Sequence, residues 1–167
     1  QGSYNANDRS QLAAENLRNK AITDLFEPGS TMKPITTAAA LESGSYSVNS
    51  TIDTNPGFRR FGRFTIRDHR NYGVMDMTEI IVKSSNVGIS RIATDLGGDV
   101  IRDLYARLGL GQPTGIGFPG EAVGVLPSPP KWRPVEEATL SYGYGMSVNA
   151  LQLAQAYMVI ANGGVRY

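Results

Sequence analysis

Two prolines six residues apart, Pro28 and Pro34, fix where the first long helix of this chain can begin. Pro28 is followed by Gly29, and such a pair interrupts any preceding regular structure. Pro34 fits only in the first turn of a helix, because its missing N–H is not needed there. The Ala-rich residues that follow favour a helix as far as Leu41, and Gly44 ends it. The spacing therefore predicts a helix over 34–41 with Ser30 at or just before its N-terminus.

Ser30 and Lys33 form an S-x-x-K pair at this helix start. Residues three apart share one face of a helix, so we expect the Lys33 amine beside the Ser30 hydroxyl. A serine hydroxyl becomes nucleophilic when a base lies within hydrogen-bond reach, and an amine removed from water can lose its proton and act as that base. The N–H groups at the helix start would stabilise an oxyanion.

The pair alone does not identify a site, because Ser128 and Lys131 repeat the spacing around two prolines that forbid a helix. Until a further element is found, an ordinary helix cap and a solvated lysine are the favoured interpretation of Ser30 and Lys33. An S-x-N sequence would be such an element, since a second hydroxyl can relay protons and an amide can hold a carbonyl. The chain has four S-x-N matches, which begin at Ser3, Ser47, Ser84 and Ser147.

Of the four matches, only Ser84-Ser85-Asn86 is expected in a short turn between two helices. Asp76 and Glu79 indicate a capping box, which predicts a helix from Asp76 to Ser84. A second helix is expected to begin near Ser85 or Asn86 and to end at Gly97-Gly98. Such a turn can present Ser84 and Asn86 to a cleft.

The rest of the sequence predicts short elements and turns, as 19 Gly and nine Pro in 167 residues require. One helix is expected over 99–108 with Val100 in its buried stripe, and another over 148–162 with Leu151, Ala154, Met158 and Ala161 on one face. Irregular or strand-like structure is expected over 1–11, 21–26, 45–75 (best strand FGRFTI) and 109–134.

Composition excludes several kinds of chemistry. With no Cys and a single His, the chain can form neither a disulfide nor a multi-histidine or cysteine metal site. A net charge of +1 gives no global attraction for nucleic acid or a membrane surface. The apolar runs are far shorter than the ~20 residues of a spanning helix. Because the chain starts without Met or a signal sequence, we interpret it as an internal piece of a longer protein.

Two other patterns receive a structural interpretation. The G-x-G-x-x-G at 115–120 contains Pro119 and no helix follows it, so a loop is favoured over a dinucleotide site. Residues 57–72 hold five Arg against Asp68 alone, with three Phe interleaved. We favour a twisted hairpin with a solvated Arg face and a Phe core face; a nucleic-acid-binding or partner-protein surface is the alternative. His69 is expected in a loop, and Trp132 is expected to anchor packing.

Four stretches of the sequence, taken together, match a known family pattern: NKAITDLFEPGSTMKP, IVKSSNVGISRIA, LGLGQPTGIGFPGE and ATLSYGYGMSVNALQLAQAY. In order and spacing the chain resembles the class B penicillin-binding proteins, most of all the division-specific FtsI-type (penicillin-binding protein 3) transpeptidases. The likeness extends from about Ser3 to the last residue.

This resemblance implies a fold and a set of roles. The fold would be α/β (α+β), the penicillin-binding transpeptidase or serine β-lactamase-like fold, with helices packed on an antiparallel sheet. Ser30 would be the acylated nucleophile and Lys33 its general base. Ser84 would relay protons, and Asn86 would bind the substrate amide carbonyl or orient Lys33. For Tyr142 and Tyr144, in a loop near the cleft, packing and ligand contact are equally expected.

One departure from the family pattern concerns the domain boundary. A K-T-G or K-S-G-T motif does not occur, because none of the four lysines precedes Ser/Thr-Gly. Residues 1–167 are therefore interpreted as the N-terminal and central part of a single transpeptidase domain, mostly its helical lobe. The strand that carries this motif would be supplied downstream or by a second chain.

By resemblance, the parent protein would cross-link peptidoglycan stem peptides at the division septum, with a D-Ala-D-Ala donor, an amine acceptor and β-lactams as inhibitors. No metal or organic cofactor would be needed. The parent would be anchored in the bacterial inner membrane with a periplasmic catalytic domain. Its partners would be an FtsW-type glycan polymerase and other divisome proteins, and not nucleic acid. The alternatives are a β-lactamase-like serine hydrolase and a non-enzymatic basic and aromatic binding module.

Overall fold

The computed structural model describes residue 7 and residues 18–166. The first half contains α1 (Lys20–Thr23), the 3₁₀ turn η2 (Gly29–Met32), α2 (Lys33–Glu42), β1 (Thr51–Asp53), β2 (Phe58–Phe61), β3 (Phe64–Arg67) and β4 (Val74–Asp76). The second half contains α3 (Met77–Val82), α4 (Asn86–Leu96), α5 (Gly98–Arg107), α6 (Pro134–Leu140) and α7 (Ala150–Ala161).

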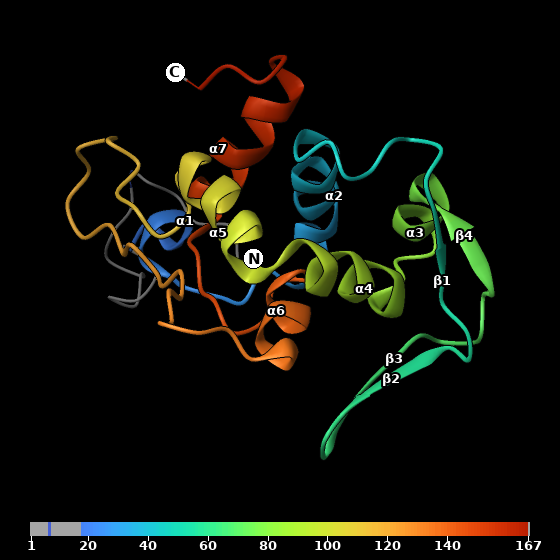
Figure 1. Cartoon of the computed structure of the whole chain (residues 1–167). Coiled ribbons are helices and arrows are strands. Elements are labelled where there is room, and N and C mark those ends of the chain that lie inside the picture. The colour runs from blue at the N-terminus through green and yellow to red at the C-terminus, as the bar shows by residue number, and fades with distance from the viewer. Residues whose placement is uncertain (1–6, 8–17, 167) are drawn as a thin grey trace.

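Helix α2 stands at the centre of the molecule, between two hydrophobic cores (Figure 1). On one side it packs with α4, α5, α6 and α7 around buried Ile35, Tyr105 and Leu140. On the other side Ala40 contributes to a core with β1, β4, α3 and α4, where Ile80 and Ile92 are fully buried. The larger core holds the N-terminal end of α2 through Met32 and Ile35, next to Ser30, and the smaller core holds its C-terminal end through Ala40.

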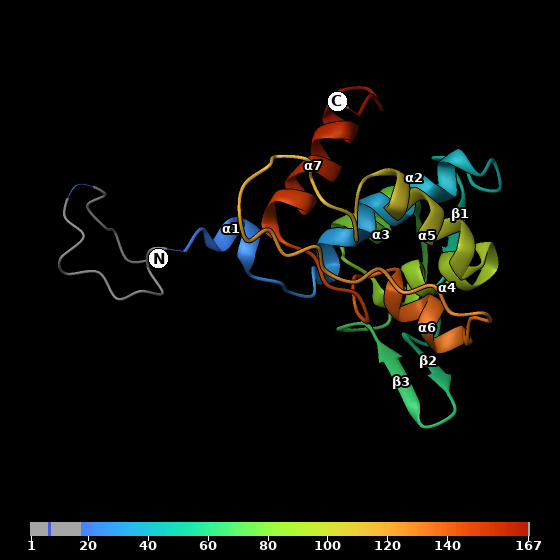
Figure 2. The same cartoon turned by 90° about the vertical axis from the view of Figure 1, so that its left-hand side faces the viewer.

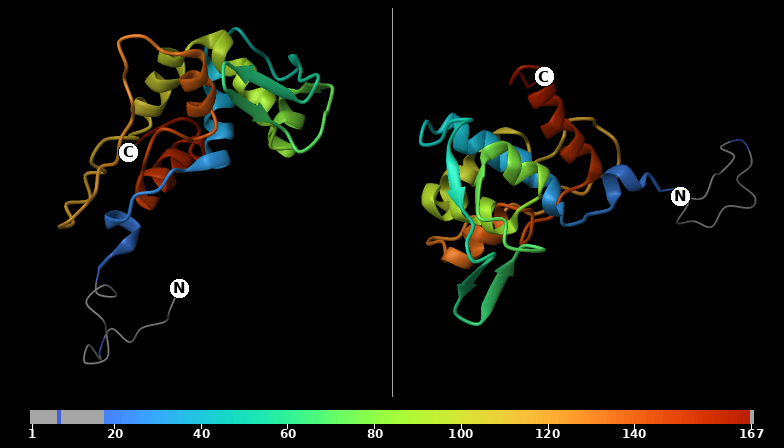
Figure 3. Two further views of the ribbon diagram at one scale, coloured as in Figure 1. Left: turned by 90° about the horizontal axis from the view of Figure 1, so that it is seen from below. Right: turned by 90° about the vertical axis from the view of Figure 1, so that its right-hand side faces the viewer.

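The strands form two separate antiparallel pairs. In one, β1 pairs with β4 so that Ile52 lies opposite Met75. In the other, β2 and β3 form a hairpin with Phe58 opposite Arg67 and Phe61 opposite Phe64. The hairpin extends away from the helices, as Figures 1, 2 and 3 show from different sides. Its C-terminal strand returns the chain to the helical body at Asp68.

Several predictions about local structure are confirmed. Helix α2 begins at Lys33 with Pro34 in its first turn, directly after the 3₁₀ turn that contains Ser30. Asp76 and Glu79 form the expected capping box at the start of α3. Ser84 and Ser85 separate α3 from α4, and Asn86 is the first residue of α4. Trp132 packs against the larger core as expected.

Other predictions are wrong, and packing explains them. The hairpin expected within residues 57–72 is present, but FGRFTI is not a single strand, because the chain turns at Gly62 with φ +58°. Its phenylalanines do not form a core face: Phe64 is 49% exposed, and arginines stack on the rings instead, with Arg60 5.4 Å from the Phe58 ring and Arg63 5.1 Å from the Phe64 ring.

The helix predictions contain further errors. Within α7 the buried residues are Gln152, Ala156 and Val159, whereas Met158 of the predicted face is exposed. Val100 of α5 is also exposed. Residues 21–23 of the strand-like run 21–26 lie in helix α1, and within this run only Phe26 forms an isolated bridge, to Val148. No helix was expected where α6 lies. The irregular structure expected over 1–11 lies outside the described residues except for residue 7.

The described residues contain no helix that could cross a membrane, since none combines the necessary length with sufficient apolar character.

Candidate active site

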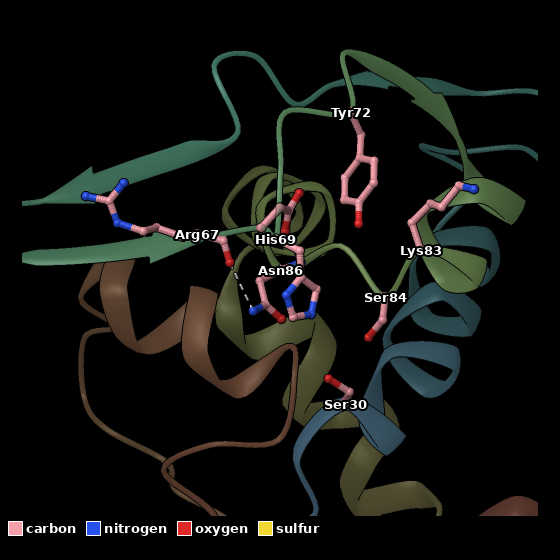
Figure 4. Close-up of a pocket in the computed structure, with 8 residues that line it drawn as sticks. Ser30, Arg67, His69, Tyr72, Lys83, Ser84 and Asn86 are labelled. Carbon is pink, nitrogen blue, oxygen red and sulfur yellow. Dashed lines mark hydrogen bonds between the residues drawn. The ribbon is translucent and has the colours of Figure 1, made fainter.

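Ser30 lies at a cavity of about 310 Å³ that three segments of the chain enclose. These segments are the turn before α2, the loop after β3 and the turn between α3 and α4. The lining residues are Ser30, Arg67, Asp68, His69, Tyr72, Lys83, Ser84 and Asn86. Figure 4 shows the side chains of Ser30 and Ser84 on the same side of this space, with Asn86 and His69 beside them. The structure thus brings the predicted S-x-x-K and S-x-N segments together.

Lys33 is buried beneath the cavity, with only 2% of its surface exposed. Its Nζ donates hydrogen bonds of 2.6 Å to the backbone oxygen and 2.9 Å to the Oγ of Ser84. Burial disfavours the charged amine and lowers the pKa of Lys33 to about 8, although the Asp68 carboxylate acts in the opposite direction. The sequence predicted the amine beside Ser30, and the structure directs both of these hydrogen bonds to Ser84 instead. The amine is nevertheless desolvated, as a general base requires.

Ser84 has a left-handed backbone conformation with φ +53°, which non-glycine residues rarely adopt. This conformation turns both its carbonyl oxygen and its hydroxyl toward Lys33. Strain of this kind persists only where the surroundings hold it, and it is common at functional sites.

Asn86 lines the cavity with its side chain directed toward the end of the hairpin. Its Nδ2 donates a 3.3 Å hydrogen bond to the backbone oxygen of Arg67, as Figure 4 shows. The bond to Arg67 uses the side-chain amide nitrogen of Asn86 and does not involve its side-chain amide oxygen. The side-chain hydrogen bonds of Lys33 go to Ser84 and that of Asn86 goes to Arg67, so these two side chains are not bonded to each other in this structure.

Asp68 is the site residue that the motifs did not reveal. Its carboxylate accepts hydrogen bonds from the Ser85 hydroxyl and from the backbone amides of Asn86 and Val87. The available signal was its place as the single acid among the five arginines of residues 57–72. His69, expected in a loop, is in a loop and also lines the cavity.

The tyrosine–glycine loop, Tyr142 to Gly145, lies against the segment that precedes Ser30. Gly29 donates a backbone hydrogen bond of 3.2 Å to Gly143, and Gly145 donates one of 3.0 Å to Glu27 Oε1. The Tyr142 ring centroid lies 6.0 Å from Lys33 Nζ, and burial raises the pKa of Tyr142 to about 12. The Tyr142 and Tyr144 rings meet edge to face at 5.6 Å. Tyr142 packs against the smaller core, Tyr144 is 49% exposed, and neither is among the residues that line the cavity.

A serine at the start of a helix, a buried amine with a lowered pKa and a second serine bonded to that amine are the parts needed for acyl transfer through a covalent ester. The fold and site therefore define a class of protein, the serine acyltransferases of Ser-Lys type. Sequence comparison identifies the family. The whole chain, residues 1–167, matches the penicillin binding protein transpeptidase domain, and the chain belongs to this family.

Relatives and solved structures of this family are similar over nearly the whole chain. The chain is 43% identical over 162 residues to the probable peptidoglycan D,D-transpeptidase PbpC of Pseudomonas aeruginosa, covering 97% of this chain and 29% of that protein. It is 41% identical over 163 residues to the peptidoglycan D,D-transpeptidase FtsI of Escherichia coli (strain K12), covering 98% of this chain and 27% of that protein. The chain thus spans less than a third of the length of these curated relatives.

Among solved structures, the apo transpeptidase domain of Burkholderia pseudomallei penicillin-binding protein 3 superposes with a TM-score of 0.84 at 41% identity, covering 89% of this chain and 45% of that one. A crystal structure described as a peptidoglycan glycosyltransferase from Burkholderia ambifaria has the same TM-score and identity, covering 88% and 46%. These structures confirm the predicted penicillin-binding transpeptidase fold.

Proposed function

We propose that this chain is part of a peptidoglycan D,D-transpeptidase and that Ser30, Lys33, Ser84 and Asn86 perform its acyl transfer. The observation that carries the proposal is the Lys33 amine, which is buried, has a pKa lowered to about 8 and bonds to Ser84 next to the cavity of Ser30. The names of the relatives, which include peptidoglycan D,D-transpeptidases, support the same reaction.

In the first half-reaction the Ser30 Oγ attacks the carbonyl carbon of the D-Ala-D-Ala bond while neutral Lys33 takes the hydroxyl proton. The tetrahedral oxyanion is stabilised by N–H groups at the start of the helix. When the C–N bond breaks, the Ser84 hydroxyl passes a proton from Lys33 to the departing amine. Free D-alanine leaves, and Ser30 remains as an ester. Asn86 positions the donor through a hydrogen bond to its amide.

In the second half-reaction an amine of a neighbouring stem peptide attacks the ester carbonyl. The new C–N bond forms as the C–O bond to Ser30 breaks, and the amine proton returns through Lys33 to the serine oxygen. The products are a cross-linked peptide and free Ser30. β-Lactams present a similar amide and would leave Ser30 as a slowly hydrolysed ester.

In our proposal, the complete transpeptidase domain that performs this reaction is longer than this chain. A strand with a K-T-G type motif would bind the donor carboxylate and supply a second oxyanion N–H. This fits the share of the solved Burkholderia pseudomallei domain that the chain covers, which is 45%. We further propose a periplasmic catalytic domain anchored in the inner membrane, acting in division with an FtsW-type glycan polymerase and other divisome proteins.

The test is intact-mass analysis after incubation with benzylpenicillin. We compare the chain alone with the extended protein, meaning this chain continued to the full length of its relatives. The extended protein should gain one persistent drug-sized adduct, and the Ser30→Ala variant should gain none. Ser128→Ala is the matched control, because Ser128 has the same spacing to Lys131 in a proline-containing loop. An adduct that survives in Ser30→Ala, or rapid hydrolysis as in a β-lactamase, would refute the proposal.

A further inference from the structure

We propose that Asp68 is a positioning residue of this site, whose carboxylate holds the Ser84-Ser85-Asn86 turn in place and sets the charge around the Lys33 amine. The inference rests on the proposed function, because it assigns Asp68 a part in the acylation of Ser30. Asp68 directly follows β3, so it stands where the hairpin rejoins the helical body.

The Asp68 carboxylate provides hydrogen-bond acceptors for the backbone amides at the start of α4. Asp68 Oδ1 accepts hydrogen bonds of 2.7 Å from the Asn86 amide and 3.0 Å from the Val87 amide. Asp68 Oδ2 accepts a 2.6 Å bond from the Ser85 hydroxyl, which itself accepts a 2.8 Å bond from the Gly88 amide. Amides in the first turn of a helix have no partner within the helix, and the partial positive charge there favours an anion. Asp68 therefore binds directly or through Ser85 to three consecutive amides.

These bonds fix the residue that contacts Lys33. Ser84 is held in its left-handed conformation, which is unfavourable for a residue with a Cβ and needs support from its neighbours. On its N-terminal side, the amides of Ser84 and Ser85 bond to Ile81 and Ile80 of α3. On its C-terminal side, Asp68 holds Ser85 and Asn86. Without Asp68 this second restraint is lost, and the Ser84 oxygens are no longer fixed at the Lys33 amine.

The charge of Asp68 has a separate effect. The Asp68 carboxylate raises the pKa of Lys33 and so opposes the larger effect of burial. The Tyr142 ring lies 6.0 Å from the amine, and the titratable or charged residues Arg67, His69 and Lys83 line the neighbouring cavity together with Asp68. An anion near an amine favours its charged form, so the Asp68 carboxylate opposes the effect of burial on Lys33. Removing its charge should therefore lower the pKa of Lys33 further.

The two effects can be separated in the extended protein by measuring the second-order rate of acylation by benzylpenicillin from about pH 5 to about pH 10. In Asp68→Asn we expect the rate at the high-pH plateau to fall about 10-fold or more, since the turn loosens. We expect the midpoint of the pH profile to move to lower pH, since the amine loses its anion. Ser85→Ala keeps the carboxylate, so its plateau should fall while its midpoint stays. Asp103→Asn removes an exposed charge on α5 and should change neither.

Thermal unfolding of each variant accompanies the rates. An Asp68→Asn variant that is less stable and slower, yet retains the wild-type midpoint, would overturn the proposal in favour of a purely structural role. Should that variant not fold, Asp68→Glu decides: it should keep the midpoint with a reduced plateau, and an unreduced plateau would overturn the proposal. Failure of the proposed function is a different result, in which wild-type protein gains no adduct at Ser30.

Discussion

The backbone amide of Gly29 donates a hydrogen bond of 3.2 Å to the carbonyl oxygen of Gly143, and so joins the turn of the proposed nucleophile to the tyrosine–glycine loop. The approach is close: a Cβ added to Gly143 would lie 2.4 Å from the Gly29 oxygen and 2.5 Å from its nitrogen. Gly143 also has φ +80°, which favours glycine. The loop therefore positions Ser30 through backbone contacts.

We expect Gly143→Ala to reduce the acylation rate by about 10-fold or more, because the added methyl group displaces the turn that carries Ser30. Gly145→Ala is the matched control, since Gly145 has a similar φ of +76° but open space around its Cα. Both variants share the backbone strain, so only the contact with Gly29 differs. Equal acylation rates for the two variants with benzylpenicillin would contradict this assignment.

The acylation rate should depend on the protonation of Lys33. In the proposed mechanism neutral Lys33 is the base, and burial lowers its pKa from 10.5 to about 8, so acylation should rise with pH to a midpoint near 8. Lys33→Met should remove acylation at every pH, whereas Lys131→Met should leave the profile unchanged. The measurement is the acylation rate against pH. A midpoint above about 10, as for a solvated lysine, would show that Lys33 is not the buried base.

Ser84 should be needed for acylation through its hydroxyl. Ser84→Ala keeps the backbone oxygen that Lys33 contacts and removes the Oγ at 2.9 Å, so we expect a loss of about 10²-fold in the acylation rate. Ser47→Ala tests another S-x-N match, in an exposed turn, and should stay within about twofold of wild type. Comparable losses in both variants would indicate a general effect on folding.

The core beneath the site contains a hydrogen-bonded pair whose removal should affect stability and not chemistry. Thr36 Oγ1 donates to the Ser141 backbone oxygen at 2.7 Å and shares a 2.5 Å hydrogen bond with the Tyr105 hydroxyl, which also lies 3.3 Å from the Leu140 backbone oxygen. Tyr105→Phe should lower the free energy of unfolding by about 1–2 kcal/mol in denaturant titrations. Tyr46→Phe, which loses a partly exposed bond to Asp95, should cost less. A drop in acylation without loss of stability would contradict this interpretation.

Local sequence signals predicted where the two candidate catalytic segments lie, because each segment is built from near neighbours in the sequence. Pro34 fixed the start of α2, and the Asp76 capping box fixed the start of α3. The turn at Ser84 then follows from the end of one helix and the beginning of the next. What local signals could not give was the direction of the Lys33 side chain, because Ser84 is 51 residues away.

The remaining errors have the same physical origin. Helix α7 is apolar on most of its faces, so periodicity could not decide that Val159 is buried and Met158 exposed. Asp68 acts through amides of a helix that begins 18 residues later, a distance at which no spacing rule applies. The arginines of the hairpin cover the Phe58 and Phe64 rings, and this left the phenylalanines outside the core.

Main-chain atoms make many of the contacts that assemble this site: Gly29 with Gly143, the Ser84 oxygen with Lys33, and the Asn86 amide with Asp68. A peptide group is the same whatever residue carries it, so substitutions of cavity-wall side chains that take no part in these bonds leave them in place. Evolution can therefore alter the wall of the cavity, at positions such as His69 and Tyr72, while the reacting groups keep their arrangement. Resistance mutations would therefore arise more readily against an inhibitor that binds the side chains of the cavity wall than against one that binds only these main-chain groups.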